Sequence, residues 1–149
     1  MKSDELLSVL VAARPDLMRN SLVSYLRTIS GITILPPMDD ASSTLQAVRA
    51  LRPDVVVADV NLSETSVLSL VQQLRKEPSK PNCIVLADSV QQKKLFNTAG
   101  ASSVLLKGFL DERLKEAVLR IQPNDKPPVA SDAFRALNLP PLPPLPKPG

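Results

Sequence analysis

Short apolar runs alternate with amphipathic segments through the first 122 residues of the chain. The stretch "VVVA" between Asp54 and Asp59 is apolar at every position, which is typical of a strand covered on both faces. Segments such as "VLSLVQQL" repeat apolar residues every three or four positions, which predicts helices with one buried face. We expect strands over residues 6–13, 32–36, 54–59, 82–88 and 102–106, and helices over residues 15–30, 41–51, 64–77, 89–100 and 111–122.

Five strands that alternate with five helices predict an α/β fold. The expected architecture is a doubly wound five-stranded parallel sheet with helices on both faces. In the third helix, the residues expected to face the core are Val67, Leu70, Val71 and Leu74. In the first helix, which we expect to end at Gly31 as its C-cap, they are Leu17, Leu22, Tyr25 and Leu26.

Proline divides the chain into two regions. Six of the 15 prolines lie in residues 1–122 and nine lie in residues 123–149. Proline lacks an amide donor and fixes φ, so the second region cannot continue the sheet or form a long helix. We therefore expect a domain over residues 1–122 and a proline-rich tail over residues 123–149.

The tail has two interpretations, a docking motif and a plain linker. Its end, "LPPLPPLPKPG", favours a polyproline II helix, and the preceding "SDAFRALNL" favours a short helix with an apolar edge. A docking motif would use the apolar residues of both pieces, which are Phe134, Leu137, Leu139, Leu142 and Leu145.

Composition excludes several classes of function. The chain carries 18 Lys and Arg against 15 Asp and Glu, and only 3% aromatic residues, which does not favour direct nucleic-acid binding. It has no histidine and a single cysteine, Cys83, expected to be a small core residue. Histidine-based acid–base catalysis and imidazole metal ligands are therefore ruled out. No apolar run approaches the roughly 18 residues of a membrane span, and acids near the N-terminus do not suit a signal peptide, so we expect a cytoplasmic protein.

Parallel α/β sheets place their ligand sites at the carboxyl ends of the strands. Apart from the short second strand, the residues that end the predicted strands or directly follow them are Ala12, Ala13, Asp59, Ala87, Asp88 and Lys107. The chemistry of the domain therefore depends on two acids and one lysine.

Two of these segments resemble the receiver domain of bacterial response regulators. "RPDVVVADVNL" is similar to the segment of the phosphoacceptor aspartate and "AGASSVLLKG" to that of the site lysine, and the resemblance extends over roughly residues 6–121. It implies the flavodoxin-like (βα)5 fold of two-component signalling. Receivers transfer a phosphoryl group to the aspartate with the help of Mg²⁺. The matching residues are Asp59 as acceptor, Asn61 as a backbone carbonyl ligand, and Lys107.

Other positions depart from the family's pattern. The acidic pair that binds Mg²⁺ falls on Ala12 and Ala13, and the hydroxyl residue that contacts the phosphoryl oxygens falls on Ala87. Asp88 replaces a small residue beside the approach of the phosphodonor, where its charge would repel phosphate. The switch aromatic falls on Val104. Asn97 stands where an apolar residue is expected, and a one-residue shift would leave Phe96 partly exposed.

These departures leave several interpretations of Asp59. In the first, it forms an ion pair with Lys107 across the crevice, since one carboxylate remains for one ammonium. In the second, it is an authentic phosphoacceptor. A third interpretation joins Asp59 and Asp88 as an acid–base pair. Arg14 either approaches one of these acids or lies in solvent.

We expect a degenerate receiver that acts as a phosphorylation-independent signalling or adaptor domain, with no enzyme activity, no metal and no cofactor. Receivers commonly bind partners or dimerise through the face of the fourth helix, fifth strand and fifth helix, which here includes Gln92, Leu95, Phe96 and Arg113. We expect protein partners, a homodimer among them, and no direct nucleic-acid binding, because no helix-turn-helix follows the domain in this sequence. The alternatives are a response regulator phosphorylated on Asp59 and a scaffold tethered by its tail.

Overall fold

The computed structural model describes residues 6–121, and the predicted order of strands and helices is confirmed there. The strands are β1 (Leu7–Ala12), β2 (Ile32–Ile34), β3 (Val55–Asp59), β4 (Asn82–Ala87) and β5 (Ser103–Leu106). The helices are α1 (Leu17–Arg27), α2 (Ala41–Leu51), α3 (Glu64–Leu74), α4 (Val90–Ala99) and α5 (Leu110–Leu119), with 3-10 turns η2 (Val60–Leu62) and η3 (Lys107–Phe109). Most elements are shorter than expected by one to three residues at an end. The proline-rich tail lies outside the described residues.

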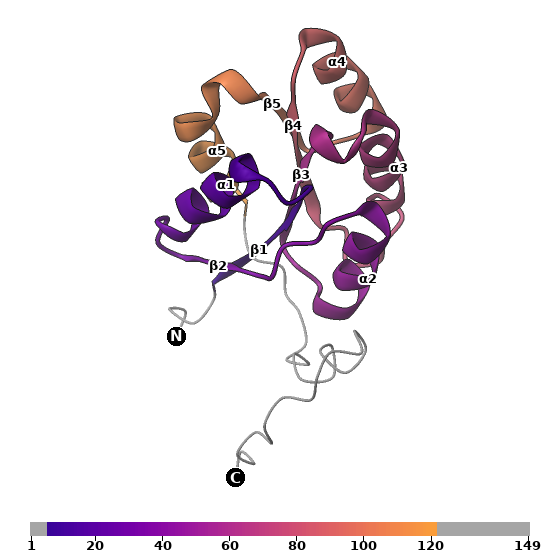
Figure 1. Ribbon diagram of the computed structural model, residues 1–149. Coiled ribbons are helices and arrows are strands. Elements are labelled where there is room, and N and C mark those ends of the chain that lie inside the picture. The colour runs from indigo at the N-terminus through magenta and orange to yellow at the C-terminus, as the bar shows by residue number, and fades with distance from the viewer. Residues whose placement is uncertain (1–5, 122–149) are drawn as a thin grey trace.

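The five strands form one parallel sheet in the order β2-β1-β3-β4-β5. Helices α1 and α5 cover one face, and α2, α3 and α4 cover the other (Figure 1). The chain leaves β1 toward β2 on one side and returns to β3 on the other, so the winding direction reverses between β1 and β3. The carboxyl ends of the strands at such a reversal form the crevice of doubly wound folds, and Asp59 ends β3 there.

Two apolar layers fill the space between the sheet and its helices. Alternate residues of β3 enter opposite layers, because successive strand side chains point to opposite faces. Val57 packs in the layer under α1 and α5, and Val56 packs in the layer under α2, α3 and α4. The predicted core face of α3 is confirmed, since the four residues expected on it are all buried. Cys83 is buried as expected.

The first helix differs from its prediction at both ends. Leu22 and Leu26 are buried, but the Leu17 side chain is 81% exposed. At 100° per residue Leu17 lies about 140° around the helix from Leu22, so the two cannot share a face. The helix also ends at Arg27 with Thr28 as its C-cap. Gly31 adopts a positive φ in the turn just before β2, so the expectation that it caps the helix is wrong.

The fourth helix is rotated relative to its prediction. Phe96 is fully buried in the layer under α2, α3 and α4, and Asn97 is exposed. Two amides from the following turn, those of Gly100 and Ala101, donate to the Phe96 carbonyl. The expectation that Phe96 is partly exposed and contacts a partner is therefore wrong, because the helix turns its largest apolar side chain inward.

Ser63 begins α3 in a strained backbone conformation. Its φ of 137° and ψ of 150° lie in a region that essentially only glycine occupies. Its side chain still caps the helix by accepting from the Ser66 amide. We expect Ser63→Gly to stabilise the domain by about 1 kcal/mol, because the released strain exceeds the few tenths lost with the cap.

Urea unfolding measures this change, and Ser89→Gly is the matched control. Ser89 caps α4 in the same way, by accepting from Gln92, but its φ of −146° is ordinary extended backbone. The control is expected to lose a little stability. A loss at Ser63 equal to that at Ser89 would show that the backbone at Ser63 carries no strain.

Candidate functional site

Lys107 lies between two carboxylates at the carboxyl edge of the sheet. Its Nζ is 2.5 Å from Oδ1 of Asp59 and 3.2 Å from Oδ1 of Asp88. Asp59 ends β3, Asp88 follows β4 and Lys107 follows β5, so one ammonium joins the ends of three adjacent strands. The ion pair of Asp59 with Lys107 expected from the sequence is present, and Asp88 extends it.

The two acids differ in their surroundings. The Asp59 side chain is fully buried, the Lys107 side chain is 22% exposed and the Asp88 side chain is 60% exposed. Desolvation lowers the pKa of Lys107, but the hydrogen bonds and charges of Asp59 and Asp88 together outweigh it, so the pKa is raised above its ordinary value. Lys107 is therefore a cation at neutral pH and balances the buried carboxylate.

The other contacts of Asp59 are few. Its Oδ1 also accepts from the Asn61 amide at 3.0 Å, in the first turn of η2. Its Oδ2 is buried and has no hydrogen-bond partner among the described residues. The positions that could supply further polar groups are Ala12, Ala13 and Ala87, and all three are fully buried.

This set of residues does not suit Mg²⁺. The ion requires several hard oxygen ligands in octahedral geometry, whereas the end of β1 offers only alanine side chains. One oxygen of the remaining carboxylate is already bonded to Lys107. Within residues 6–121, no cluster of three or more acidic, histidine or cysteine side chains is arranged to hold a metal. The expectation of no metal site therefore rests on the side chains present, which offer too few oxygen ligands.

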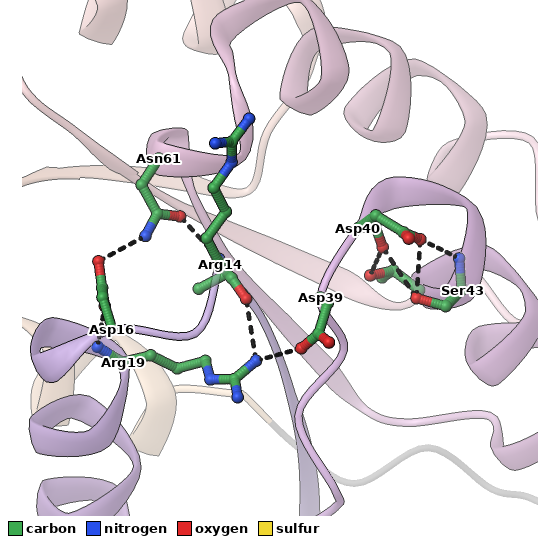
Figure 2. Close-up of polar contacts among 9 residues, drawn as sticks. Arg14, Asp16, Arg19, Asp39, Asp40, Ser43 and Asn61 are labelled. Carbon is green, nitrogen blue, oxygen red and sulfur yellow. Dashed lines mark hydrogen bonds and ion pairs between the residues drawn. The ribbon is translucent and has the colours of Figure 1, made fainter.

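The loop after β1 is organised by side chains that we did not predict. The Asn61 side chain donates to the Asp16 carboxylate and accepts from the Arg14 amide, both at 3.0 Å (Figure 2). The Arg19 guanidinium donates to the Ala13 carbonyl and to Asp39, so it connects α1, the end of β1 and the loop before α2 (Figure 2).

Asp16 also begins α1, and this could have been found from the sequence. It accepts from the Arg19 amide as the helix N-cap, and this hydrogen bond is the main cause that lowers the pKa of the Asp16 carboxyl. An aspartate directly before an apolar periodic segment is a recognised helix start. Arg14 makes no ion pair with Asp59 or Asp88 in the described part of the chain, and its side chain is exposed.

The residues expected to contact partners differ in their exposure. Arg113 is exposed on α5, and Gln92 and Leu95 are partly exposed on α4. The Gln92 side chain is engaged within the domain, because its Oε1 accepts from the Asp88 amide at 2.8 Å. The five apolar residues of the tail (Phe134, Leu137, Leu139, Leu142 and Leu145) lie outside the described residues.

A comparison with protein families matches residues 9–119 to the response regulator receiver domain. The chain belongs to this family. The match covers both layers of the core and the Asp59–Lys107 site, so the chain contains a receiver domain of two-component signalling. None of the described helices is long and apolar enough to span a membrane.

Relatives and solved structures agree with this assignment. The receiver is 39% identical over 85 residues to the protein TcrX of Mycobacterium tuberculosis, covering 56% of this chain and 35% of TcrX. It is 28% identical over 120 residues to the response regulator GacA of Pseudomonas aeruginosa, covering 78% of this chain and 55% of GacA. The chain thus spans between a third and about half of these relatives. The chemotaxis response regulator CheY4 of Vibrio cholerae has the same fold, with a TM-score of 0.67, 21% identity, and coverage of 77% of this chain and 98% of that one.

Proposed function

We propose that this receiver domain works without phosphorylation and signals by binding other proteins. The observation that carries the proposal is the state of Asp59: its carboxylate is fully buried, and one oxygen is bonded to Lys107 and to the Asn61 amide. A carboxylate that attacks phosphorus must reach the phosphodonor, and this one is closed to solvent. The ion pair of Asp59 with Lys107 supports a structural role for both residues.

The surrounding residues support the same proposal. Phosphoryl transfer depends on charge neutralisation at the transferred oxygens, and the fully buried side chains of Ala12 and Ala13 supply no ligand for the cation that would provide it. Ala87 supplies no hydroxyl to a phosphoryl group. Asp88 places a carboxylate 3.2 Å from the lysine, where it competes with any incoming anion.

The binding surface in this proposal is the face of α4, β5 and α5, together with the proline-rich tail. Within that face Leu95 and Arg113 remain accessible, and Phe96 supports the helix from inside. The tail over residues 123–149 would act as a docking motif for a protein partner. In the same proposal the domain has no catalytic activity of its own, binds no nucleic acid directly, and acts in the cytoplasm.

A second function, phosphorylation of Asp59, is favoured by one observation. The buried Oδ2 has no hydrogen-bond partner among the residues described, so one oxygen of the carboxylate is free to react if the site opens. This alternative requires a rearrangement that exposes Asp59 and moves Asp88 away from Lys107.

Beryllofluoride with Mg²⁺, followed by amide NMR of the full chain, separates the two functions. We expect no change at the amides of Asp59, Asn61 and Lys107, because the site binds neither the metal nor the anion. Acetyl phosphate with Mg²⁺ is expected to add no mass to the protein. A receiver that retains its acidic pair serves as the positive control for both reagents, and Asp59→Asn serves as the negative control. Shifts centred on Asp59 and Lys107 that disappear in Asp59→Asn would overturn the proposal.

A further inference from the structure

The ion pairs of Lys107 continue into the first turn of α4. Asp88 contacts Lys107 through its carboxylate, and its backbone amide donates to Oε1 of Gln92 at 2.8 Å. The backbone amide of Gln92 in turn donates to the Ser89 hydroxyl at 3.2 Å. Gln92 is therefore held at two points, by residues 88 and 89, directly where the helix begins.

This network joins a buried charge to a surface element. Asp59 is fully buried at the end of β3, and Gln92 and Leu95 lie at the surface of α4. Only Ser89 separates Asp88 from the first residue of α4, so a displacement of Asp88 must move the start of the helix. Asp88 therefore links the Lys107 ammonium to the first turn of α4.

We propose that the Asp88 carboxylate acts as a permanent negative charge beside Lys107 and thereby holds α4 in one position. Its carboxylate supplies Lys107 with a second negative charge beside Asp59, so Lys107 has two anionic partners without any added group. This inference rests on the proposed function, because it explains how α4 keeps one position, and its surface stays accessible to a partner, when Asp59 is not phosphorylated. Asp88 acts as a positioning residue, and the accessible part of α4 is the surface that it positions.

Hydrogen exchange of the α4 amides in the full chain tests the inference. Asp88→Asn removes the charge, and Gln92→Ala removes the hydrogen bond to residue 88 but keeps all three charges. Gln92→Ala is expected to speed exchange of the amides of residues 92–96 by about threefold to tenfold, the range for one hydrogen bond. Asp88→Asn is expected to speed it by about threefold to fivefold, the upper range for an exposed ion pair. Because both changes break one network, the double variant is expected to exceed the larger single effect by less than twofold.

Glu64→Gln is the control for loss of one negative charge. Glu64 is an exposed acid in the first turn of α3, and its replacement is expected to leave α4 exchange within twofold of the original protein. Exchange in Asp88→Asn equal to that in Glu64→Gln would overturn the inference, as would fully multiplicative effects in the double variant. The measurement uses no Mg²⁺ and no phosphodonor, so its failure counts against the network alone. Beryllofluoride binding would count against the proposed function instead.

Discussion

Phe96→Ala is expected to lower the free energy of unfolding by about 3–5 kcal/mol, the usual cost of deleting a buried aromatic side chain. Phe96 is among the largest fully buried side chains of the described residues. Its removal leaves a cavity between α4 and the sheet, because the closely packed layer cannot collapse completely into the space. Urea unfolding followed by far-UV circular dichroism measures the loss.

Leu95→Ala is the matched control on the same helix. Leu95 is only partly buried and packs at the margin of the same layer. Leu95→Ala is therefore expected to lower the free energy of unfolding by less than half as much as Phe96→Ala. The comparison distinguishes the two roles of the helix, since a side chain reserved for a partner costs little in the free protein. Equal losses at the two positions would contradict the packing of α4 described here.

Lys107→Met is expected to lower the free energy of unfolding by about 3–5 kcal/mol, because it leaves a buried carboxylate without its counter-charge. The loss should come from Asp59, so the double variant Asp59→Asn with Lys107→Met is expected to recover most of it. Lys115→Met is the control, since Lys115 is exposed on α5 and its replacement is expected to cost less than 0.5 kcal/mol, as for surface substitutions generally. A double variant as unstable as Lys107→Met alone would show that Asp59 is not the source.

The same pair predicts a dependence on alkaline pH. The folded-state pKa of Lys107 is raised above its ordinary value of 10.5, so its contribution to stability is fully present below that pH and is lost as the pH rises through the folded-state value. The stability difference between the original protein and Lys107→Met should stay constant from neutral pH to about pH 10 and then narrow. A difference that narrows below pH 9 would contradict the raised pKa.

The fold could be predicted from the sequence because its signals are local. Apolar runs and periodic segments alternate at a regular spacing, and each begins or ends at a residue with a clear preference. The ends of the strands could be placed well enough to bring Asp59 and Lys107 together. That pair was expected from the topology together with the resemblance to receivers, since parallel strands present their carboxyl ends at one edge.

The details of the site depend on rotations that the sequence pattern does not specify. A one-residue difference in the register of α4 decides whether Phe96 or Asn97 faces the core. The contact of Asp88 with Lys107 likewise depends on the course of a two-residue connection. The Arg19 contact with Asp39 joins segments that are 20 residues apart in the sequence, so no local pattern indicates it.

The buried cysteine makes the native chain resistant to thiol reagents. Cys83 is the single cysteine of the protein, and burial raises the pKa of its thiol to about 12. A thiol reacts as the thiolate and only when a reagent can reach it. Cys83 packs in the layer under α2, α3 and α4, so labelling requires these helices to move away from the sheet. The rate at which this one sulfur is alkylated therefore reports how often the layer of α2, α3 and α4 opens in the native protein.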